Sequence, residues 1–478
     1  MELRDYQTRA VDAIRAAFGQ HRAVCLALQV GGGKTVIACE VIRRARERGR
    51  RCLFLVHRVE LVEQARDRLA AFGIEAGIIK AGFPEQRDLD VQVACIPTLI
   101  RRENPPAELV IFDECHHAAS ASWLAVLEHY REAGAWILGI TATPQRLDGK
   151  PLAVAFDTII EPVTTRELVY AGYLVEPVVL APPSINRKGL KIRGGDYALP
   201  ELVERMAKLT GSITDYWESH ARDKLTLAFA CNVEHSKMIE EALRERGARV
   251  AHVDGSTPKD ARADVNRALR SGDLDVVTNC MIWTEGFDLP ELGALIVARP
   301  TASLGLHRQM VGRVMRPPGP VVVLDHAGNH HVHGMVTDDV AWSLEGKPKK
   351  PGEAPVRTCG ECFAIIPLNA AVCPNCGAEP EAPEEAEQPQ VENPGVLVKF
   401  SRADKSEAYR GIVAEASMRG YKLGWARMRY KERFGVWPRF RQMERDIYRC
   451  AGHEWQRREH GWRVVSRCGR CFDERVLT

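Results

Sequence analysis

Residues 29–35 read QVGGGKT, a glycine-rich turn that ends in a lysine and a threonine. An apolar run at residues 23–28 precedes the turn, and a helical pattern at residues 36–46 follows it. A turn of this kind between a strand and a helix can cradle phosphate groups, because its backbone N–H groups and the helix N-terminus point at the anion. Leu28 stands where the usual G-x-x-x-x-G-K-T pattern has its first glycine, but three glycines remain for a tight turn. An ordinary glycine-rich turn is the alternative, and a second motif argues against it.

That second motif is VIFDECHH at residues 110–117, an apolar strand that ends in two carboxylates. At such a strand end Asp113 can hold Mg²⁺ through water, and Glu114 can polarise the water that attacks a γ-phosphate. An acidic pair after a strand is more often a solvated turn, but a position roughly eighty residues behind a phosphate cradle favours phosphoryl transfer. In the cradle, Lys34 can reach the β- and γ-phosphates, and Mg²⁺ can be held by Thr35. The predicted cradle consists of Gly31, Gly32, Gly33, Lys34 and Thr35.

Short β-rich runs alternate with amphipathic helical patterns in two blocks of the chain, which predicts an α/β fold with two parallel-sheet domains in tandem. In the first block we expect strands at residues 23–28, 52–56, 91–95, 109–112 and 135–140. In the second block we expect strands at residues 225–229, 249–253, 274–278, 294–297 and 320–324. The piece between the blocks reads as a linker and an insertion whose role the sequence does not reveal.

Length and composition fit a globular protein of about three domains. The chain has 478 residues, of which 45% are hydrophobic and 27% charged, and its net charge of +3 argues for no partner by itself. No run approaches the roughly 18 apolar residues of a membrane span, and the N-terminus is no signal peptide, so we expect a cytoplasmic protein without a membrane partner. Of the 14 cysteines, the seven within the first 280 residues are scattered singly, as buried reduced thiols would be.

Taken together, the motifs of roughly residues 1–330 resemble those of the superfamily 2 helicases. The ordered motifs are LRDYQ at 3–7, QVGGGKT at 29–35, VHRVEL at 56–61, DECH at 113–116, TATPQR at 141–146, TEGFD at 284–288 and QMVGRVMR at 309–316. They look like motifs Q, I, Ia, a DExH-type II, III, V and VI of that superfamily. The residues of these motifs are similar to those of the RadD-like or type III restriction-helicase branch rather than to those of the DEAD-box RNA helicases.

The resemblance implies two RecA-like domains that close on ATP and Mg²⁺. Arg313 and Arg316 would bring positive charge from the second domain to the γ-phosphate, an effect worth roughly 10³ to 10⁵ in rate in related sites. The implied nucleotide contacts outside the cradle are Tyr6, Gln7, Gly286 and Asp288. Coupling between closure and motion would involve His116, Thr141, Thr143 and Gln309. The implied nucleic-acid contacts are His57, Arg58 and Thr278.

Two sets of cysteines and histidines have metal-ligand spacing. The pattern C-x₂-C-x₁₀-C-x₂-C formed by Cys359, Cys362, Cys373 and Cys376 is typical of tetrahedral structural Zn²⁺ rather than of a redox dithiol. So short a module has too small a core to fold unaided, so the metal would supply folding energy on the order of 10 kcal/mol. A second, tentative Zn²⁺ set is Cys450, His453, Cys468 and Cys471, for which a free cysteine and a solvent-facing histidine remain the alternative.

The predicted organisation follows from these motifs. We expect a first RecA-like domain at 1–160, a linker and insertion at 161–223, a second domain at 224–345, a zinc ribbon at 355–378, an acidic linker at 379–398 and a basic, aromatic C-terminal module with a helical part at 399–478. That module has 20 Lys/Arg against 10 Asp/Glu, with four tryptophans, which favours nucleic-acid contact over a merely solvated face. Docking of a protein partner is the alternative.

The sequence thus predicts an ATP-dependent, nucleic-acid-stimulated DNA helicase or translocase that acts on single-stranded or forked DNA. An RNA helicase is one alternative. A nucleotide-gated clamp that binds or remodels nucleic acid without strand separation is another.

Overall fold

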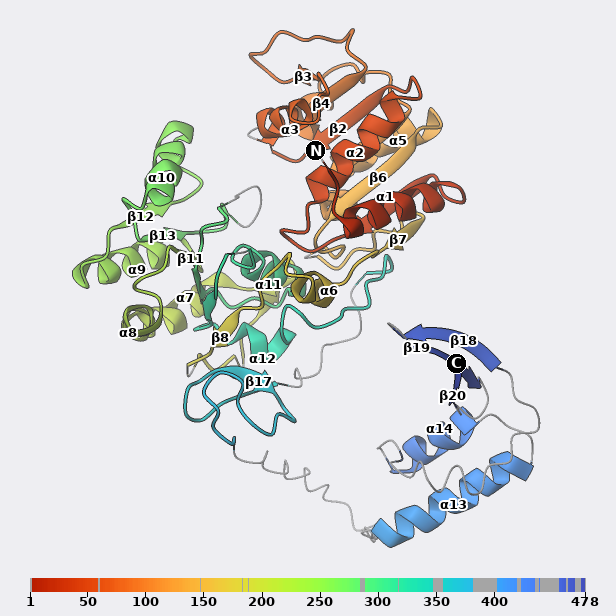
Figure 1. Cartoon of the computed structure of the whole chain (residues 1–478). Helices are drawn as coiled ribbons and strands as arrows, with labels where there is room; N and C mark the ends of the chain where they lie inside the picture. The colour runs from red at the N-terminus through yellow and green to blue at the C-terminus, as the bar shows by residue number, and fades with distance from the viewer. Residues whose placement is uncertain are drawn as a thin grey trace. The chain divides into compact units, whose positions relative to one another are not determined.

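The computed structural model describes most of the chain up to residue 380 and five segments beyond it (Figure 1). The described ranges are 2–58, 61–146, 148–182, 184–187, 189–283, 289–316, 318–346, 356–380, 402–418, 423–434, 455–460, 463–468 and 474–477, together with residue 438. Two compact units divide the chain, residues 1–384 and residues 385–478. None of the described helices is long and apolar enough to cross a membrane.

The first domain is built on a seven-stranded parallel sheet with the order β3-β4-β2-β5-β6-β1-β7. Its strands are β1 (Ala23–Ala27), β2 (Cys52–Val56), β3 (Gly77–Ile79), β4 (Val91–Cys95), β5 (Leu109–Asp113), β6 (Trp136–Thr141) and β7 (Thr158–Ile160). Its helices are α1 (Asp5–Phe18), α2 (Lys34–Arg46), α3 (Leu61–Ala70), α4 (Ile96–Leu99), the 3₁₀ turn η1 (Cys115–His117) and α5 (Ala121–Glu132). Helix α6 (Thr165–Tyr170) follows in the segment that joins the two domains.

Both faces of this sheet are buried, which explains why its strands read as continuous apolar runs. Alternate residues of one strand go to opposite faces. In β1, Val24 and Leu26 pack in one apolar cluster with residues of α1, α2 and α3, whereas Ala23 and Cys25 pack in another with residues of α5. The seven scattered cysteines are free thiols and six of them are buried, as predicted.

The second domain has a six-stranded parallel sheet with the order β12-β13-β11-β14-β15-β8. Its strands are β8 (Val178–Leu180), β11 (Thr226–Ala230), β12 (Val250–Val253), β13 (Val276–Asn279), β14 (Ala294–Ala298) and β15 (Val322–Leu324). Its helices are α7 (Leu199–Ala207), α8 (Thr210–His220), α9 (Val233–Glu245), α10 (Lys259–Ser271), α11 (Leu304–Val311) and α12 (Asn329–His333). The predicted class, two parallel-sheet α/β domains in tandem, is confirmed.

Residues 161–223, expected as a linker and insertion, contribute to the second domain. Strand β8 forms its sheet edge next to β15, and residues of α7 and α8 pack into its core. Trp217 of α8 is fully buried and donates its indole N–H to Thr226 Oγ1 at 3.1 Å. A short hairpin of β9 (Ile192–Arg193) and β10 (Asp196–Tyr197) lies in the same segment. The second sheet therefore begins in sequence well before residue 224.

A cysteine-rich hairpin of β16 (Val356–Thr358) and β17 (Ile365–Pro367) packs against the β8 edge. The second unit, by itself, contains α13 (Arg402–Met418), α14 (Leu423–Phe434) and a three-stranded antiparallel sheet of β18 (Trp455–His460), β19 (Arg463–Cys468) and β20 (Glu474–Leu477). Helices α13 and α14 share a small core in which Tyr409 and Tyr430 meet at a ring distance of 4.9 Å. These two tyrosines therefore serve packing within the module.

Candidate active site

The glycine-rich turn joins β1 to α2 at the carboxyl end of the first sheet. Gly31 and Gly33 adopt φ angles of 84° and 80°, a region that residues with a Cβ rarely occupy. A Cβ on Gly33 would lie 2.5 Å from Gln7 Nε2 and 3.7 Å from Tyr6 Oη. The glycines therefore allow both the left-handed turn and a close approach of α1, while Lys34 and Thr35 begin α2.

The start of α1 closes one side of this turn. Tyr6 donates its hydroxyl to the Gly32 carbonyl at 3.0 Å, and burial raises the pKa of Tyr6 above its usual value. Gln7 Oε1 accepts the backbone N–H of Arg4 at 3.0 Å. Tyr173, which the sequence did not single out, lies with its ring 4.9 Å from that of Tyr6. The Arg4 guanidinium stacks on the ring of Tyr173, 4.6 Å from the ring centroid, so Tyr173 and Arg4 extend the site.

The two carboxylates stand opposite the lysine of the turn. Glu114 Oε1 lies 4.0 Å from Lys34 Nζ, and Asp113 Oδ1 accepts the Glu114 backbone N–H at 3.0 Å. Burial, together with the neighbouring Glu114 carboxylate, raises the pKa of Asp113 to about 7. Glu114 has a positive φ of 49°, which a residue with a side chain adopts only when its surroundings hold it there. The strand end is thus a strained, desolvated acidic site.

Polar contacts run from Glu114 across to the second domain. Glu114 Oε2 lies 3.5 Å from His116 Nδ1, which in turn lies 3.0 Å from Thr141 Oγ1. Thr141 Oγ1 accepts the Thr143 backbone N–H at 3.1 Å. Gln309 of α11 donates its amide to Thr143 Oγ1 at 3.3 Å. The four residues expected to couple the domains therefore form one chain of contacts with the carboxylate.

The second domain also supplies two arginines. Arg313 and Arg316, which follow α11, line one cavity of 610 Å³ together with residues of the turn, the start of α1 and the acidic pair. Gly312 makes this approach possible, because a Cβ there would lie 2.7 Å from Val30 Cβ. Burial lowers the pKa of Arg316, and the nearby Arg68 adds to the effect. The predicted nucleotide and catalytic residues of both domains that the structure describes thus surround or adjoin one space.

A separate cavity of 340 Å³ contains two of the three expected nucleic-acid contacts, His57 and Arg58. Arg58 reaches the second domain through a 3.5 Å contact with the Ile282 carbonyl, and the ring of His57 stacks on that of His117 at 5.4 Å. Thr278 is the third expected contact. It is fully buried in β13 and does not line this cavity, and its assignment as a nucleic-acid contact stays a prediction.

Some sequence assignments lie outside the described residues. This holds for Gly286 and Asp288 of the predicted nucleotide site. It also holds for Cys450, His453 and Cys471 of the tentative second zinc set and for the side chain of Cys468. These assignments stay predictions.

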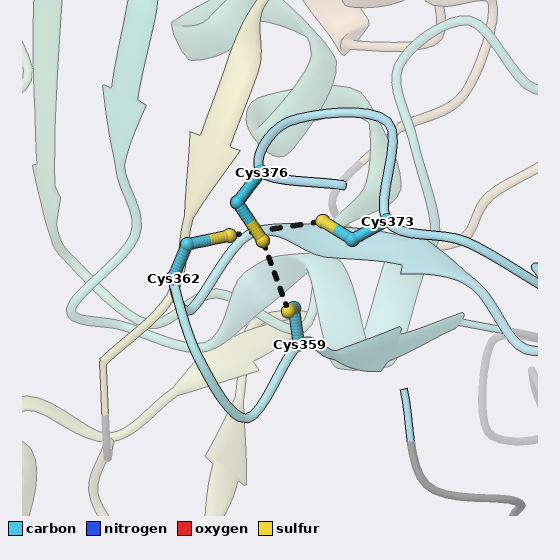
Figure 2. A group of neighbouring side chains, drawn as sticks. All are labelled: Cys359, Cys362, Cys373 and Cys376. Atoms are coloured by element: carbon cyan, nitrogen blue, oxygen red, sulfur yellow. Dashed lines mark hydrogen bonds between the residues drawn. The ribbon is translucent and has the colours of Figure 1, made fainter. Parts of the chain in front are cut away.

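The four cysteines of the first zinc pattern converge (Figure 2). All four sulfur atoms lie within 4.8 Å of one another, with Cys359 and Cys376 at 3.8 Å and Cys362 and Cys373 at 3.7 Å. Tetrahedral thiolates about 2.3 Å from a zinc ion would be about 3.8 Å apart, so the donor set fits that ion. Backbone N–H groups that follow Cys359 lower its pKa to about 7, whereas the neighbouring thiols raise the pKa of Cys376 to about 12.

The cysteine module is fastened to the second sheet, which the sequence did not predict. Leu180 of β8 forms an antiparallel bridge with Ala364, and Ala181 donates its N–H to the Phe363 carbonyl at 2.8 Å. Thr358 Oγ1 lies 3.2 Å from His331 Nε2 of α12. Cys359 and Cys373 are buried within the second domain's core, so the cysteine module packs as part of that domain rather than as a separate domain.

Comparison with known proteins gives the family. Residues 1–146 match the type III restriction enzyme res subunit, and residues 204–318 match the helicase conserved C-terminal domain. A 51.5 kDa protein of Lactococcus phage (isolate 7-9) is 31% identical over 373 residues, which cover 76% of this chain and 79% of the phage protein.

Two relatives carry functional names. A Schizosaccharomyces pombe protein, irc3, provisionally named a mitochondrial ATP-dependent helicase, is 34% identical over 342 residues, which are 66% of this chain and 55% of that protein. The DNA 3'-5' translocase XPB2 of Sulfurisphaera tokodaii is 24% identical over 358 residues, which are 66% of this chain and 79% of the translocase. The motifs, the two parallel sheets and these matches agree, and the chain belongs to the superfamily 2 helicases, in the branch that contains the type III restriction enzymes.

Proposed function

We propose that this chain is a motor that hydrolyses Mg·ATP in the 610 Å³ cavity and uses the reaction to move along or unwind DNA. The observation that carries the proposal is the composition of that cavity. A phosphate cradle and two carboxylates come from the first domain, and two arginines come from the second. Phosphoryl transfer needs positioning and charge neutralisation rather than a covalent group, and these residues supply both.

In the first domain Lys34 holds the β- and γ-phosphates and the glycines wrap their oxygens with backbone N–H groups. Thr35 and Asp113 would hold Mg²⁺, which supplies charge neutralisation at the phosphates. Glu114 orients and polarises the attacking water, and its 4.0 Å distance to Lys34 supports a position beside the γ-phosphate. Tyr6 and Gln7 pack against the glycine-rich turn and form the side of the cavity that recognises the adenine base of the nucleotide.

The positions of two arginines explain how the two domains would close on the nucleotide. Arg313 and Arg316 belong to the second domain, so their attraction to the γ-phosphate draws the two domains together. The contacts from Glu114 through His116, Thr141 and Thr143 to Gln309 make the second domain sensitive to the state of the carboxylate. Alternating closure and release can then shift the domains along a strand held by residues such as His57 and Arg58.

DNA is favoured over RNA as the track. The support is the named activity of the archaeal relative, a DNA translocase, and the match of the first domain to a restriction enzyme subunit. Residues 399–478, with their excess of Lys/Arg, would add a further nucleic-acid contact, and docking of a protein partner is the alternative for this module. An RNA track and a nucleotide-gated clamp without strand separation are the competing functions.

We also propose that Cys359, Cys362, Cys373 and Cys376 bind one structural Zn²⁺. The support is their mutual distance, with all four sulfur atoms within 4.8 Å of one another. A closed set of four thiolates leaves no open position for substrate, so the role of the ion is to hold the two loops of the module together.

One assay tests the motor function. Steady-state ATP hydrolysis is measured with no nucleic acid, single-stranded DNA, duplex DNA, a DNA fork and RNA, and strand displacement is followed on the fork. We expect DNA to raise the rate and RNA to raise it less. Greater stimulation by RNA would reverse the choice of track. Hydrolysis that DNA stimulates without translocation or displacement would identify a clamp.

A further inference from the structure

The first domain has another cavity, at the amino ends of its strands. Arg50 lies just before β2, Leu109 begins β5 and Trp136 begins β6. All three residues line a space of 330 Å³, called the arginine cavity below, together with residues of α1 and α2. The glycine-rich turn and the acidic pair stand at the carboxyl ends of the strands. The length of a five-residue strand such as β2, about 16 Å, therefore separates the two sites.

The inner wall of the arginine cavity is apolar. It is formed by Val11 and Ile14 of α1, Val41 and Ala45 of α2, and Leu109 of β5. All five side chains are buried and belong to one apolar cluster of the core. The volume lies at the lower end of the range for ligand sites. An apolar side chain that entered this cavity would exchange water for a surface of its own kind, which is favourable.

The outer part of the arginine cavity is positively charged. Arg15, Arg44, Arg48 and Arg50 line it, and no Asp or Glu is among the described residues that do so. Arg44 pairs with Glu40 at 2.8 Å. Within the described part of the chain, no carboxylate forms an ion pair with any of the other three arginines. An apolar wall thus meets three guanidinium groups whose charge the fold does not balance.

The indole of Trp136 favours a peptide over a nucleic acid as the ligand. The guanidinium carbons of Arg22 and Arg50 lie 4.5 Å and 4.0 Å from the centroid of its ring. A single strand binds by stacking its bases on exposed aromatic faces, and here two guanidinium groups already lie against the ring. The same stacking holds the Arg50 guanidinium at the cavity, which prepares it to bind a carboxylate through two hydrogen bonds.

We propose that the arginine cavity is a docking site for an acidic peptide segment of another protein. Carboxylates of the peptide pair with Arg15, Arg48 and Arg50, and one apolar side chain of the peptide enters the cavity between α1 and α2. A ligand that carries several carboxylates and an apolar group matches the charge and the apolar wall together. The proposal does not rest on the motor function, because this surface takes no part in binding the nucleotide.

The test measures binding of a fluorescein-labelled peptide to the full-length protein by fluorescence anisotropy. The probe is a peptide of about ten residues that contains several glutamates and a single leucine. In one control peptide serines replace the glutamates, and in another alanine replaces the leucine. We expect each control peptide to bind about tenfold more weakly than the probe, because one loses the charge attraction and the other the buried apolar side chain.

Two exposed arginines locate the binding on the protein. Arg15→Glu and Arg48→Glu should each weaken binding of the probe by about tenfold, since each replaces an attraction with a repulsion. Arg46→Glu is the matched control, because Arg46 is exposed at the end of α2 and does not line the cavity. ATP hydrolysis should be the same in all three variants and the wild type. Thermal unfolding shows whether each variant is still folded.

Several results would overturn the docking site. The probe could bind no more tightly than the serine peptide, or Arg46→Glu could weaken binding as much as the two cavity variants do. Displacement of the probe by single-stranded DNA, with weaker DNA binding in Arg15→Glu and Arg48→Glu, would assign the surface to nucleic acid. Tighter binding of the probe after glutamine replaces the glutamates of residues 379–392 would assign the cavity to the chain's own acidic segment instead of a partner.

Discussion

At the scale of single residues, Glu114 is the most constrained side chain of the site. Its positive φ of 49° costs on the order of 1 kcal/mol or more for a residue with a Cβ. One carboxylate oxygen of Glu114 faces Lys34 and the other faces His116. In this conformation the carboxylate therefore contacts both the phosphate cradle and the chain of contacts to the second domain. The proposed role of Glu114 in positioning the attacking water would account for retaining this conformation.

The first prediction concerns this carboxylate and its lysine. Glu114→Gln should leave ATP binding near normal and lower turnover by about 10² to 10⁴, the usual contribution of a general base. Lys34→Ala should instead weaken nucleotide binding, because it removes the charge that faces the phosphates. Binding of a fluorescent ATP analogue and steady-state hydrolysis distinguish the two effects. Glu128→Gln, on the exposed side of α5, is the control, and near-normal hydrolysis by Glu114→Gln would refute the assignment.

The second prediction concerns buried histidines that crowd the end of the second sheet. His326 is fully buried, and burial lowers its pKa to about 4, against about 6.5 in an unfolded chain. Between pH 6.5 and pH 4, His326 binds a proton in the unfolded chain but stays neutral in the folded chain. Stability attributable to His326 is therefore complete above pH 6.5 and declines as the pH falls towards 4, by about 1.4 kcal/mol per pH unit for one proton.

Urea unfolding at several pH values between 7 and 4 measures this slope. His326→Leu should flatten it, whereas His129→Gln, at an exposed position of α5, should leave it unchanged. Equal slopes for the wild type and His326→Leu would show that this histidine titrates normally in the folded protein.

At the scale of elements, the approach of α11 to the phosphate cradle depends on one missing side chain. Gly312 directly follows α11, and a Cβ there would lie 2.7 Å from Val30 Cβ and 2.9 Å from the Arg308 carbonyl. Real Cβ atoms do not come so close, so a larger residue must push the second domain away from the cradle. The arginines beyond Gly312 would then be displaced from the γ-phosphate position.

The third prediction follows. Gly312→Ala should lower kcat by about tenfold or more while ATP affinity changes less, because the closed state suffers most. Gly211→Ala is a close control, since a Cβ on Gly211 in α8 would have no atom within 4 Å. If kcat is the same in both variants, the two domains do not close through this contact.

The cysteine module gives the fourth prediction. Elemental analysis of protein purified without chelator should find one Zn²⁺ for the first set and a second only if Cys450, His453, Cys468 and Cys471 also bind. Cys373→Ser should lose one equivalent and lower the unfolding temperature, since the ion holds together a module that covers the β8 edge. Cys280→Ser, outside the set, should keep its metal. Zinc-free wild-type protein would contradict both sites.

Long and short strands differ in how well the sequence predicts them. The central strands, such as β2 and β4, were predicted at their observed bounds, because both faces are buried and the apolar run has a sharp end. The short strands β3, β7 and β8 were missed: each has only three residues, too few to establish a pattern. Their place in the sheets is set by neighbouring strands, which a local pattern does not contain.

At the scale of the whole molecule, this chain is an ATP-hydrolysing helicase by family, built as tandem RecA-like domains. Sequence motifs single out Lys34, Glu114 and Arg313 as candidates because phosphoryl transfer needs those kinds of side chain, and the structure brings the three to one cavity. Their distances, the link from Thr143 to Gln309 and the part played by Tyr173 depend on how the domains meet. No local sequence pattern contains those contacts, and the burial of Thr278 shows that a motif alone does not tell a buried residue from an exposed one.

In the proposed mechanism one nucleotide is hydrolysed between two domains, with the arginines of the second acting on phosphates held by the first. The most direct measurement is DNA-stimulated kcat together with ATP affinity for Arg313→Ala and Arg316→Ala. Arg267→Ala is the control, because Arg267 is 76% exposed on α10. We expect kcat to fall by about 10³ or more in at least one variant, with a much smaller change in affinity. Unchanged DNA-stimulated kcat in both variants would contradict hydrolysis at a shared, two-domain site.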